Sequence, residues 1–403
     1  MNDYLPDDAK KLRYVEQKTR ETAQLYGYQE IITPVIESHE LLAAKAGDEI
    51  RHRMYQFNDM AGRKIALRGE FTPSIARLVA TKMRTTPKPI KLYTVGSLYR
   101  YDEPQYGRNR EFWQANYELI GTKHPEADAE IISVTSCLLN TIGLRNHQLK
   151  IGHMGILRGI LSQEGIQETQ QNQIMQLLDK KQWDQALTTA QNLKASRLCL
   201  KTLKTLIQTR GKDTQNILKE IAQTVENFET ASTAAQNLHE IIQLVRNSNI
   251  KSTIHIEAGF ARGLEYYTGM ILEAYAPELE KTDLAIGGGG RYDKLIELFG
   301  GEPCESSVLI RSNLDPGVAP HRERRGRGEG ARGRGDRHGQ GGRRLGAAVG
   351  ALHDVRGGAV AARDVLRGAG YAPTLECHRY GFSGQRCWCT VRQTAAKRGS
   401  TLG

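Results

Sequence analysis

Residues 98–121, LYRYDEPQYGRNREFWQANYELIG, give the clearest indication of the fold. It joins two extended segments, 90–101 and 111–121, which we predict to be antiparallel strands because both are rich in aromatic and β-branched residues. Side chains alternate between the two faces of a strand, so one face of the second strand carries Phe112, Gln114, Asn116 and Glu118. A polar row of this kind in a sheet often lines a ligand cleft, because buried polar groups need partners.

The loop between the two strands supplies positive charge. Arg100, Arg108 and Arg110 lie in it or at its base, and guanidinium groups bind phosphate oxygens through paired hydrogen bonds. The combination favours a polyphosphate ligand, while a charged hairpin with surface ion pairs would show the same spacing.

Two further stretches place polar groups near the ends of predicted elements. In RKIALRGEFTPSIARL, Glu70 ends a strand and Thr72 begins a helix, where N-capping by Thr72 is the simpler interpretation. In ARGLEYYTGMILE, Arg262 comes shortly before Tyr266 and Tyr267, and aromatic packing across strands would also account for the tyrosine pair.

Four consecutive glycines, Gly287–Gly290, precede Tyr292 in AIGGGGRYDKL. We predict a strand, a glycine loop and a helix here, with the loop allowing a close approach to a ligand or only a tight turn. The stretch matches neither a Walker A loop nor a GxGxxG fingerprint, so it is a weak signal alone.

The rest of the chain indicates an α+β fold, with a large antiparallel sheet flanked by helices. Helical periodicity predicts a helix over 7–26, and the Pro-free block 154–247 predicts four to six inserted helices. We expect four parts: a first core part (1–153), a helical insertion domain (154–247), a second core part (248–303) and an atypical Arg/Gly-rich tail (304–403).

The net charge of +11 is concentrated near the C-terminus. Residues 302–403 contain 17 Arg, 1 Lys and 9 acidic residues, so they carry +9 of that charge, and they hold 19 of the 41 glycines. A basic disordered tail that binds RNA, a separate domain, and a stretch read out of frame would each produce such a switch in composition.

Composition argues against membrane and secreted proteins. No apolar run approaches the ~20 residues that cross a bilayer, and MNDYLPDDAKK at the N-terminus lacks the apolar core of a secretory signal. The six cysteines show no zinc-type CxxC pairing and suit a reduced compartment. We therefore expect a cytoplasmic protein without a membrane anchor or a metal-ligand set.

The motifs taken together, in this order and spacing, resemble histidyl-tRNA synthetase, a class II aminoacyl-tRNA synthetase. DYLPDDAKKLRYVEQKTRETAQLYGYQEIITPVIE resembles that family's N-terminal segment and motif 1, with Pro34 as the motif 1 proline, and residues 98–121 resemble motif 2. RGLEYYTG and GGGRYDKL resemble its two histidine signatures. The resemblance spans about residues 2–303.

The resemblance implies a sheet that binds ATP and histidine side by side. Arg100 would contact the α-phosphate of ATP, and Arg108 would contact the phosphates or the base side. Arg262 would bridge the amino-acid carboxylate and the α-phosphate, which makes Arg100 and Arg262 the catalytic candidates.

The resemblance also implies a histidine pocket. The residues implied to hold the amino group are Glu70, Thr72 and Gln114. Those implied to surround the imidazole are Glu118 and Tyr267 at its edge, with Tyr266 and Tyr292 completing the pocket.

The implied reaction makes histidyl-adenylate from histidine and ATP and then transfers the histidyl group to tRNA(His). Both reactants of the first step are anionic, so fixed cations and Mg²⁺ on the phosphates would offset their repulsion. The carboxylate is already ionised at pH 7, so no general base is needed. The family likeness further implies a homodimer through motif 1 and a clamp on the tRNA acceptor stem formed by residues 154–247.

The resemblance stops after Pro303. The family continues with a strand and a helix carrying the motif 3 arginine, which grips ATP, and then with an anticodon-binding domain; this chain reads CESSVLIRSNLDPG and shows no motif 3. The break coincides with the switch in charge, which favours a frameshift as its origin. Loss of the motif 3 strand would leave an exposed edge in the sheet.

Two other functions fit parts of the sequence. The synthetase-like regulatory subunit of ATP phosphoribosyltransferase shares this fold, but its aminoacylation residues typically drift, whereas this chain keeps Glu70, Arg100, Gln114, Glu118, Arg262 and Tyr267. A non-catalytic RNA-binding protein acting through its Arg/Gly tail would lose RNA binding on deletion of residues 304–403.

The missing motif 3 arginine leads to a first prediction. The purified chain is expected to show weak or no histidine-dependent ATP–pyrophosphate exchange, because one cation that grips ATP is lost. Exchange of labelled pyrophosphate into ATP measures this, and turnover at a normal synthetase rate would refute it.

Overall fold

The computed structural model describes residues 3–103, 109–248, 250–277, 279, 285–302, 307–313, 374–377 and 389–392. The chain divides into two compact units, Met1–Pro320 and His321–Gly403. In the second unit, the described residues form one antiparallel pair, β13 (Thr374–Cys377) with β14 (Cys389–Arg392). The fold of the first unit positions the site.

A nine-stranded sheet runs through the first unit, and its inner strands from β5 to β7 pair antiparallel. Its strands, in spatial order, are β1 (Gln29–Glu30), β5 (Ile90–Tyr99), β6 (Glu111–Ile120), β12 (Ser307–Asn313), β11 (Gly287–Tyr292), β10 (Met270–Tyr275), β7 (Gln148–His153), β9 (Thr253–Glu257) and β8 (Arg210–Gly211). The predicted α+β class and the predicted strand pair around residues 98–121 are confirmed.

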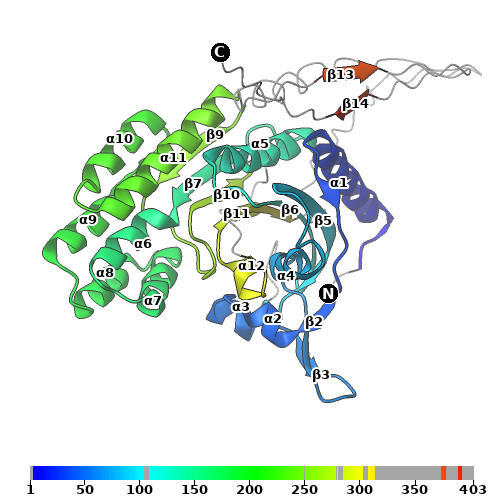
Figure 1. The fold of residues 1–403 in the computed structure, drawn as a ribbon, viewed down its shortest axis with the longest axis horizontal. Coiled ribbons are helices and arrows are strands. Elements are labelled where there is room, and N and C mark those ends of the chain that lie inside the picture. Colours follow the sequence, from blue (N-terminus) through cyan, green and yellow to red (C-terminus); the bar gives the residue numbers. More distant parts are fainter. Residues whose placement is uncertain are drawn as a thin grey trace, which may run out of the picture. The chain divides into compact units, whose positions relative to one another are not determined.

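Helices cover both faces of this sheet (Figure 1). On one face lie α1 (Pro6–Leu25) and α5 (Pro125–Thr141), and on the other lie α4 (Thr72–Lys82) and the short α12 (Leu295–Leu298). Two neighbouring residues of β6 show the division: the Tyr117 hydroxyl donates to the Thr19 carbonyl of α1 at 2.9 Å, whereas Glu118 accepts from Thr72 of α4.

A second, smaller sheet with the order β2-β4-β3 lies beside the first. Its elements and the helices next to it are β2 (Ile36–Ser38), α2 (His39–Ala43), α3 (Asp48–His52), β3 (Gln56–Asn58) and β4 (Lys64–Leu67). The chain breaks between β1 and β2 around Pro34, which has no amide proton to donate to a ladder.

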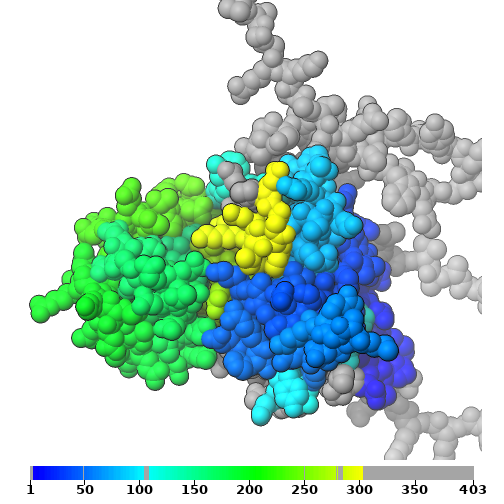
Figure 2. Space-filling view, turned by 60° about the horizontal axis from the view of Figure 1, so that its bottom comes forward, coloured from blue at the N-terminus to red at the C-terminus, as the bar shows by residue number. Residues whose placement is uncertain are grey.

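Six helices occupy residues 154–247 of the described chain, the upper end of the predicted range. They are α6 (Met154–Gln163), α7 (Glu168–Asp179), α8 (Trp183–Asn192), α9 (Arg197–Gln208), α10 (Thr214–Thr224) and α11 (Glu229–Asn247). Figure 2 shows them in green as a lobe beside the blue and yellow parts of the core. The chain itself divides only after Pro320, so a separate insertion domain stays a prediction. Among the helices of the described residues, none combines the length and the hydrophobicity of a transmembrane span.

The prediction of a glycine loop at Gly287–Gly290 is wrong, because these residues form strand β11. Gly290 is needed for close packing rather than for a turn. A Cβ atom on Gly290 would lie 2.6 Å from the Met270 carbonyl oxygen and 3.0 Å from the ring of Tyr267. Only a residue without a side chain leaves room for that ring against the strand.

The expectation of a missing strand after Pro303 is also wrong. Strand β12 (Ser307–Asn313) lies between β11 and β6 and pairs with both over its length. The hydrogen bonds between strands are made by backbone groups, which do not depend on the side chains. The apolar residues of ESSVLI are therefore compatible with a strand even if this stretch is read out of frame. Nearly all of residues 314–403 lie outside the described residues, so the loss of the motif 3 helix stays a prediction.

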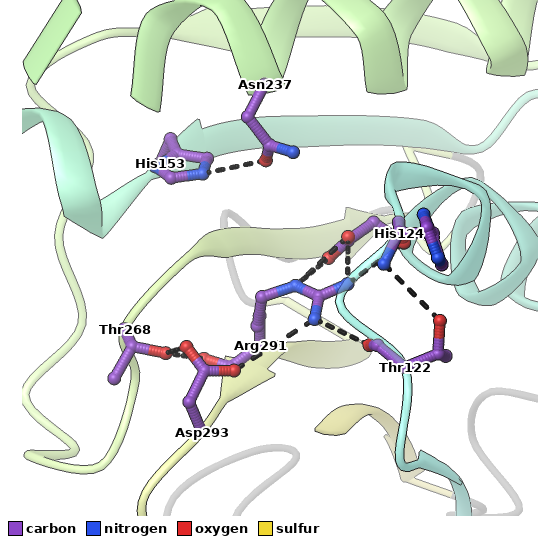
Figure 3. A network of polar contacts seen from close by, with 8 residues as sticks. Thr122, His124, His153, Asn237, Thr268, Arg291 and Asp293 are labelled. Carbon is purple, nitrogen blue, oxygen red and sulfur yellow. Dashed lines mark hydrogen bonds and ion pairs between the residues drawn. The ribbon is translucent and has the colours of Figure 1, made fainter. Parts of the chain in front are cut away.

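A buried ion pair ties the sheet to α5 (Figure 3). Arg291 of β11 binds Asp128 of α5, whose side chain is fully buried, and also donates to the carbonyl oxygens of Thr122 at 3.0 Å and His124 at 3.3 Å. Close by, burial lowers the pKa of His153 to about 4, so this imidazole is neutral at pH 7.

This ion pair leads to a prediction about stability. Arg291→Met should lower the free energy of unfolding by about 3–5 kcal/mol, because Asp128 would remain as an uncompensated buried charge. Arg291→Met with Asp128→Asn should recover part of the loss. Guanidinium denaturation measures both.

The matched control is Arg63→Met. The Arg63 guanidinium pairs with Asp59 at 2.7 Å on the surface, where water screens the charges, so its loss should change the free energy of unfolding far less. Equal losses for Arg63→Met and Arg291→Met would contradict the assignment.

Candidate functional site

The candidate site is built around the carboxylate of Glu118 on β6, which has no exposed surface. Three donors reach it: the Tyr292 hydroxyl at 2.6 Å, the Asn116 amide at 2.8 Å and the Thr72 hydroxyl at 3.0 Å. They come from β11, β6 and α4, so residues far apart in the chain converge here. The predicted members Glu118, Thr72 and Tyr292 are thus brought together.

The interpretation of Thr72 as a helix cap is wrong. Helix α4 begins at Thr72 itself, its N-cap position is Phe71, and no side chain caps it. The Thr72 hydroxyl instead donates across to Glu118, a residue 46 positions away in the sequence. Its role is therefore a tertiary contact within the site.

The second carboxylate of the site, Glu70, is also buried and accepts a hydrogen bond from the Tyr266 hydroxyl at 3.0 Å. The Tyr266 ring packs edge-on against Tyr267 at 4.8 Å and Tyr292 at 6.0 Å between centroids. Tyr266 and Tyr267 precede β10, so they are not strand residues and their packing is not the cross-strand kind. Two carboxylates and three tyrosines form one buried group.

Strand β11 connects this buried group to Arg262. A Cβ atom added to Gly288 would lie 3.8 Å from Arg262 Nη2. A Cβ atom added to Gly290 would lie 3.0 Å from the Tyr267 ring. The register through β12 places Gly290 in the same cross-strand row as Glu118. The two strands are two spacings apart, about 10 Å, on one face of the sheet. Arg262 therefore lies on the face that carries Glu118.

A cleft of about 1320 Å³ opens on this face. Among its lining residues are four predicted or neighbouring site residues, Arg100, Phe112, Gln114 and Arg262. Arg100 is held by a hydrogen bond from its Nε to the Gly69 carbonyl at 2.8 Å and lies 5.3 Å over the Phe112 ring. Another part of the lining belongs to the helical lobe, where Lys180, Lys181 and Arg210 are basic and Asp179 is acidic, with Trp183 among them.

Sequence reasoning missed the partners of Arg262. Its guanidinium binds Glu273 of β10, which also forms an ion pair with Lys150 of β7 at 2.5 Å. Burial alone would raise the pKa of Glu273, but the charges of Arg262 and Lys150 outweigh it and lower that pKa. The available signal was a single acidic residue inside the apolar strand MILEAY, since unpaired charges are rarely buried.

One predicted site residue is not located. Arg108 falls in 104–108, outside the described residues, so its contact with ATP stays a prediction. Within the described residues, no group of three or more His, Cys, Asp or Glu side chains is placed to hold a metal ion.

The sequence matches known proteins over its first three quarters. A family model described as histidyl-tRNA synthetase matches residues 1–307. The histidine–tRNA ligase of Methanocaldococcus jannaschii is 42% identical over 304 residues, which are 75% of this chain and 70% of that protein. The histidine–tRNA ligase of Saccharolobus solfataricus is 40% identical over 308 residues, with the same two shares.

Solved structures share the fold. An ATP phosphoribosyltransferase regulatory subunit/histidyl-tRNA synthetase from Bacillus halodurans superposes with a TM-score of 0.69 at 24% identity, covering 79% of this chain and 81% of that chain. Histidyl-tRNA synthetase from a Nostoc species superposes with a TM-score of 0.63 at 22% identity, covering 78% and 72%.

Proposed function

Because this chain belongs to the histidyl-tRNA synthetase family, we propose that it is a histidine–tRNA ligase, which activates histidine with ATP and transfers it to the 3′ end of tRNA(His). The absence of a motif 3 arginine from the sequence is expected to weaken the activation step. The observation that carries the proposal is the buried group of Glu70, Glu118 and three tyrosines directly beside a cleft lined by Arg100 and Arg262. Such a site offers acceptors and aromatic rings on one side and cations on the other.

The buried group suits the imidazole and the amino group of histidine. Glu118 and Tyr267 would recognise the imidazole edge, with Tyr266 and Tyr292 as walls. Glu70, Thr72 and Gln114 would hold the ammonium group, which a carboxylate at Glu70 complements in charge. A competitor without ring nitrogens would leave buried polar groups unpaired, and that loss supplies discrimination.

The two arginines suit the activation step. The histidine carboxylate attacks the α-phosphorus and a new C–O–P link forms. The phosphoanhydride bond between the α- and β-phosphates breaks, and pyrophosphate leaves. Arg262 would hold the carboxylate and the α-phosphate together, and Arg100 would stabilise the charge on the phosphate, as fixed cations do without reorganising. Arg108 would contact the remaining phosphates or the base.

ATP would enter as its magnesium complex. A magnesium ion needs only one or two protein carboxylates when phosphates and water fill its other positions. It would neutralise charge on the phosphates while Arg100 and Arg262 bind the oxygens on the protein side.

The tRNA end would enter the same cleft. Its wall from residues 154–247 carries Lys180, Lys181 and Arg210 with Trp183 next to Arg210, the centre of that guanidinium being 5.6 Å from the indole ring. Cations that bind phosphates and an aromatic ring that can stack a base suit a single-stranded 3′ end. Such a ligase would work in the cytoplasm.

The regulatory-subunit alternative is not favoured. The curated relatives at 40–42% identity carry the name histidine–tRNA ligase. The structure whose title names the regulatory subunit is 24% identical, a level that supports the fold alone.

A homodimer through motif 1 is part of the proposal. Ile36 of β2 pairs with Leu67, and Phe57 of β3 pairs with Ile65, so these apolar residues share one face of the small sheet. Ile36 is 48% exposed and Phe57 44% exposed. Apolar groups gathered on one face and left to solvent are typical of a protein interface.

Histidine binding tests the proposed function. Isothermal titration calorimetry should show binding of L-histidine but not of L-phenylalanine or L-glutamine. Glu118→Gln should weaken histidine binding by about 10- to 100-fold, since a hydrogen bond to a charged group contributes roughly 1.5–3 kcal/mol. A folded chain that does not prefer histidine would refute the proposal.

Glu111→Gln is the matched control for Glu118→Gln. Glu111 lies on the same strand but on its other face, and it likewise accepts a hydrogen bond from a tyrosine, Tyr99, at 3.0 Å. Its substitution should leave histidine affinity unchanged.

Light scattering coupled to gel filtration tests the dimer. The double variant Ile36→Glu, Phe57→Glu should run as a monomer, because four charges would be buried across a twofold contact. Leu298→Glu, at an apolar residue 51% exposed on α12, is the control and should stay dimeric. A monomeric parent protein would overturn this part of the proposal.

A further inference from the structure

A group of three charged side chains lies on the floor of the cleft. Glu273 accepts a hydrogen bond from Arg262, accepts a second from the Tyr275 hydroxyl at 2.6 Å, and forms the ion pair with Lys150. The side chains of Glu273 and Lys150 are 8% and 14% exposed, and all three charged residues line the cleft. The network therefore faces the space in which substrate would bind.

Lys150 is held in place by aromatic rings as well as by charge. Its ammonium group lies 4.0 Å from the centroid of the Phe260 ring and 5.4 Å from that of Tyr275. Lys150 and Glu273 are direct partners across β7 and β10, so the backbone fixes their separation. These contacts hold the ammonium group of Lys150 in a fixed position beside Glu273.

The signs of the three charges explain why Lys150 is present. A carboxylate beside Arg262 fixes the direction of its guanidinium, but it also cancels the positive charge that Arg262 would offer to an anion. Lys150 cancels the charge of Glu273 in turn. Arg262, Glu273 and Lys150 together carry +1, as Arg262 would alone, but with the guanidinium held by a partner.

We propose that Glu273 and Lys150 are positioning residues for the carboxylate of histidine. Glu273 orients Arg262, and Lys150 neutralises Glu273 so that the substrate carboxylate meets a net positive charge. Neither residue touches the substrate in this arrangement. The inference rests on the proposed function, because it takes histidine as the ligand.

Comparison of two ligands tests this role. Histidinol keeps the imidazole and the amino group of histidine but has an alcohol in place of the carboxylate. Calorimetry on Lys150→Met should show histidine affinity reduced by about tenfold. Without Lys150, the negative charge of Glu273 would repel the carboxylate of histidine, and solvent would screen this repulsion only in part. Histidinol affinity should change by less than about twofold, because an alcohol carries no charge to repel.

Glu273→Asp provides a second test that keeps the charge. The shorter side chain withdraws from Arg262, so histidine should again bind more weakly while histidinol should not. Circular dichroism establishes that each variant is folded, and if Lys150→Met is not, Glu273→Asp decides the question.

Lys91→Met is the matched control. Lys91 also pairs with a carboxylate, Glu130 at 2.6 Å, and lies 5.6 Å over a ring, that of Tyr28, but it does not line the cleft. Its substitution should alter neither affinity.

The outcomes separate the two proposals. A parent protein that does not bind histidine refutes the proposed function. A parent protein that binds histidine, with folded variants at Lys150 and Glu273 that weaken both ligands equally or neither, refutes the positioning role alone.

Discussion

The structure depends on one constraint, that the fully buried carboxylate of Glu118 must be surrounded by hydrogen-bond donors. Its donors are Thr72, Asn116 and Tyr292, which join the start of α4, strand β6 and strand β11. Because an unpartnered charge in the interior is strongly unfavourable, these elements can dock in only one register relative to one another. The same contacts that complete the core therefore arrange the polar surface beside the cleft.

Strand β11 serves both faces of the sheet, which explains its unusual sequence. Gly290 leaves room for the Tyr267 ring, and Gly288 lies beside Arg262; both of these side chains come from the segment before β10. Arg291, between Gly290 and Tyr292, points to the other face and binds Asp128 of α5. Because side chains alternate between the two faces of a strand, Gly290 leaves space on the face of the site while Arg291 anchors helix α5 on the other face.

In the cleft, charged side chains lie next to side chains of opposite charge. Arg262 is matched by Glu273, and Glu273 is matched by Lys150, so an anionic substrate would find a cation whose direction is already fixed. Preorganised charge of this kind is what a reaction between a carboxylate and a polyphosphate needs, since both reactants repel each other. Lys180, Lys181 and Arg210, which also line the cleft, would extend the same attraction to the phosphates of a nucleic acid.

Features that depend on neighbours along the chain could be predicted from the amino-acid sequence. The periodicity of residues 7–26 and the alternation around 98–121 predicted α1, β5 and β6. The spacing of apolar residues along the chain indicates which face of a helix or strand is buried. The motifs also identified the family and most members of the candidate site. Four features became clear from the three-dimensional structure alone: the partner of the Thr72 hydroxyl, the strand at Gly287–Gly290, the central place of β12, and the pairing of Glu273 with Lys150. Each of these depends on a partner supplied by a distant element, and no local pattern records which distant backbone or charge will come close.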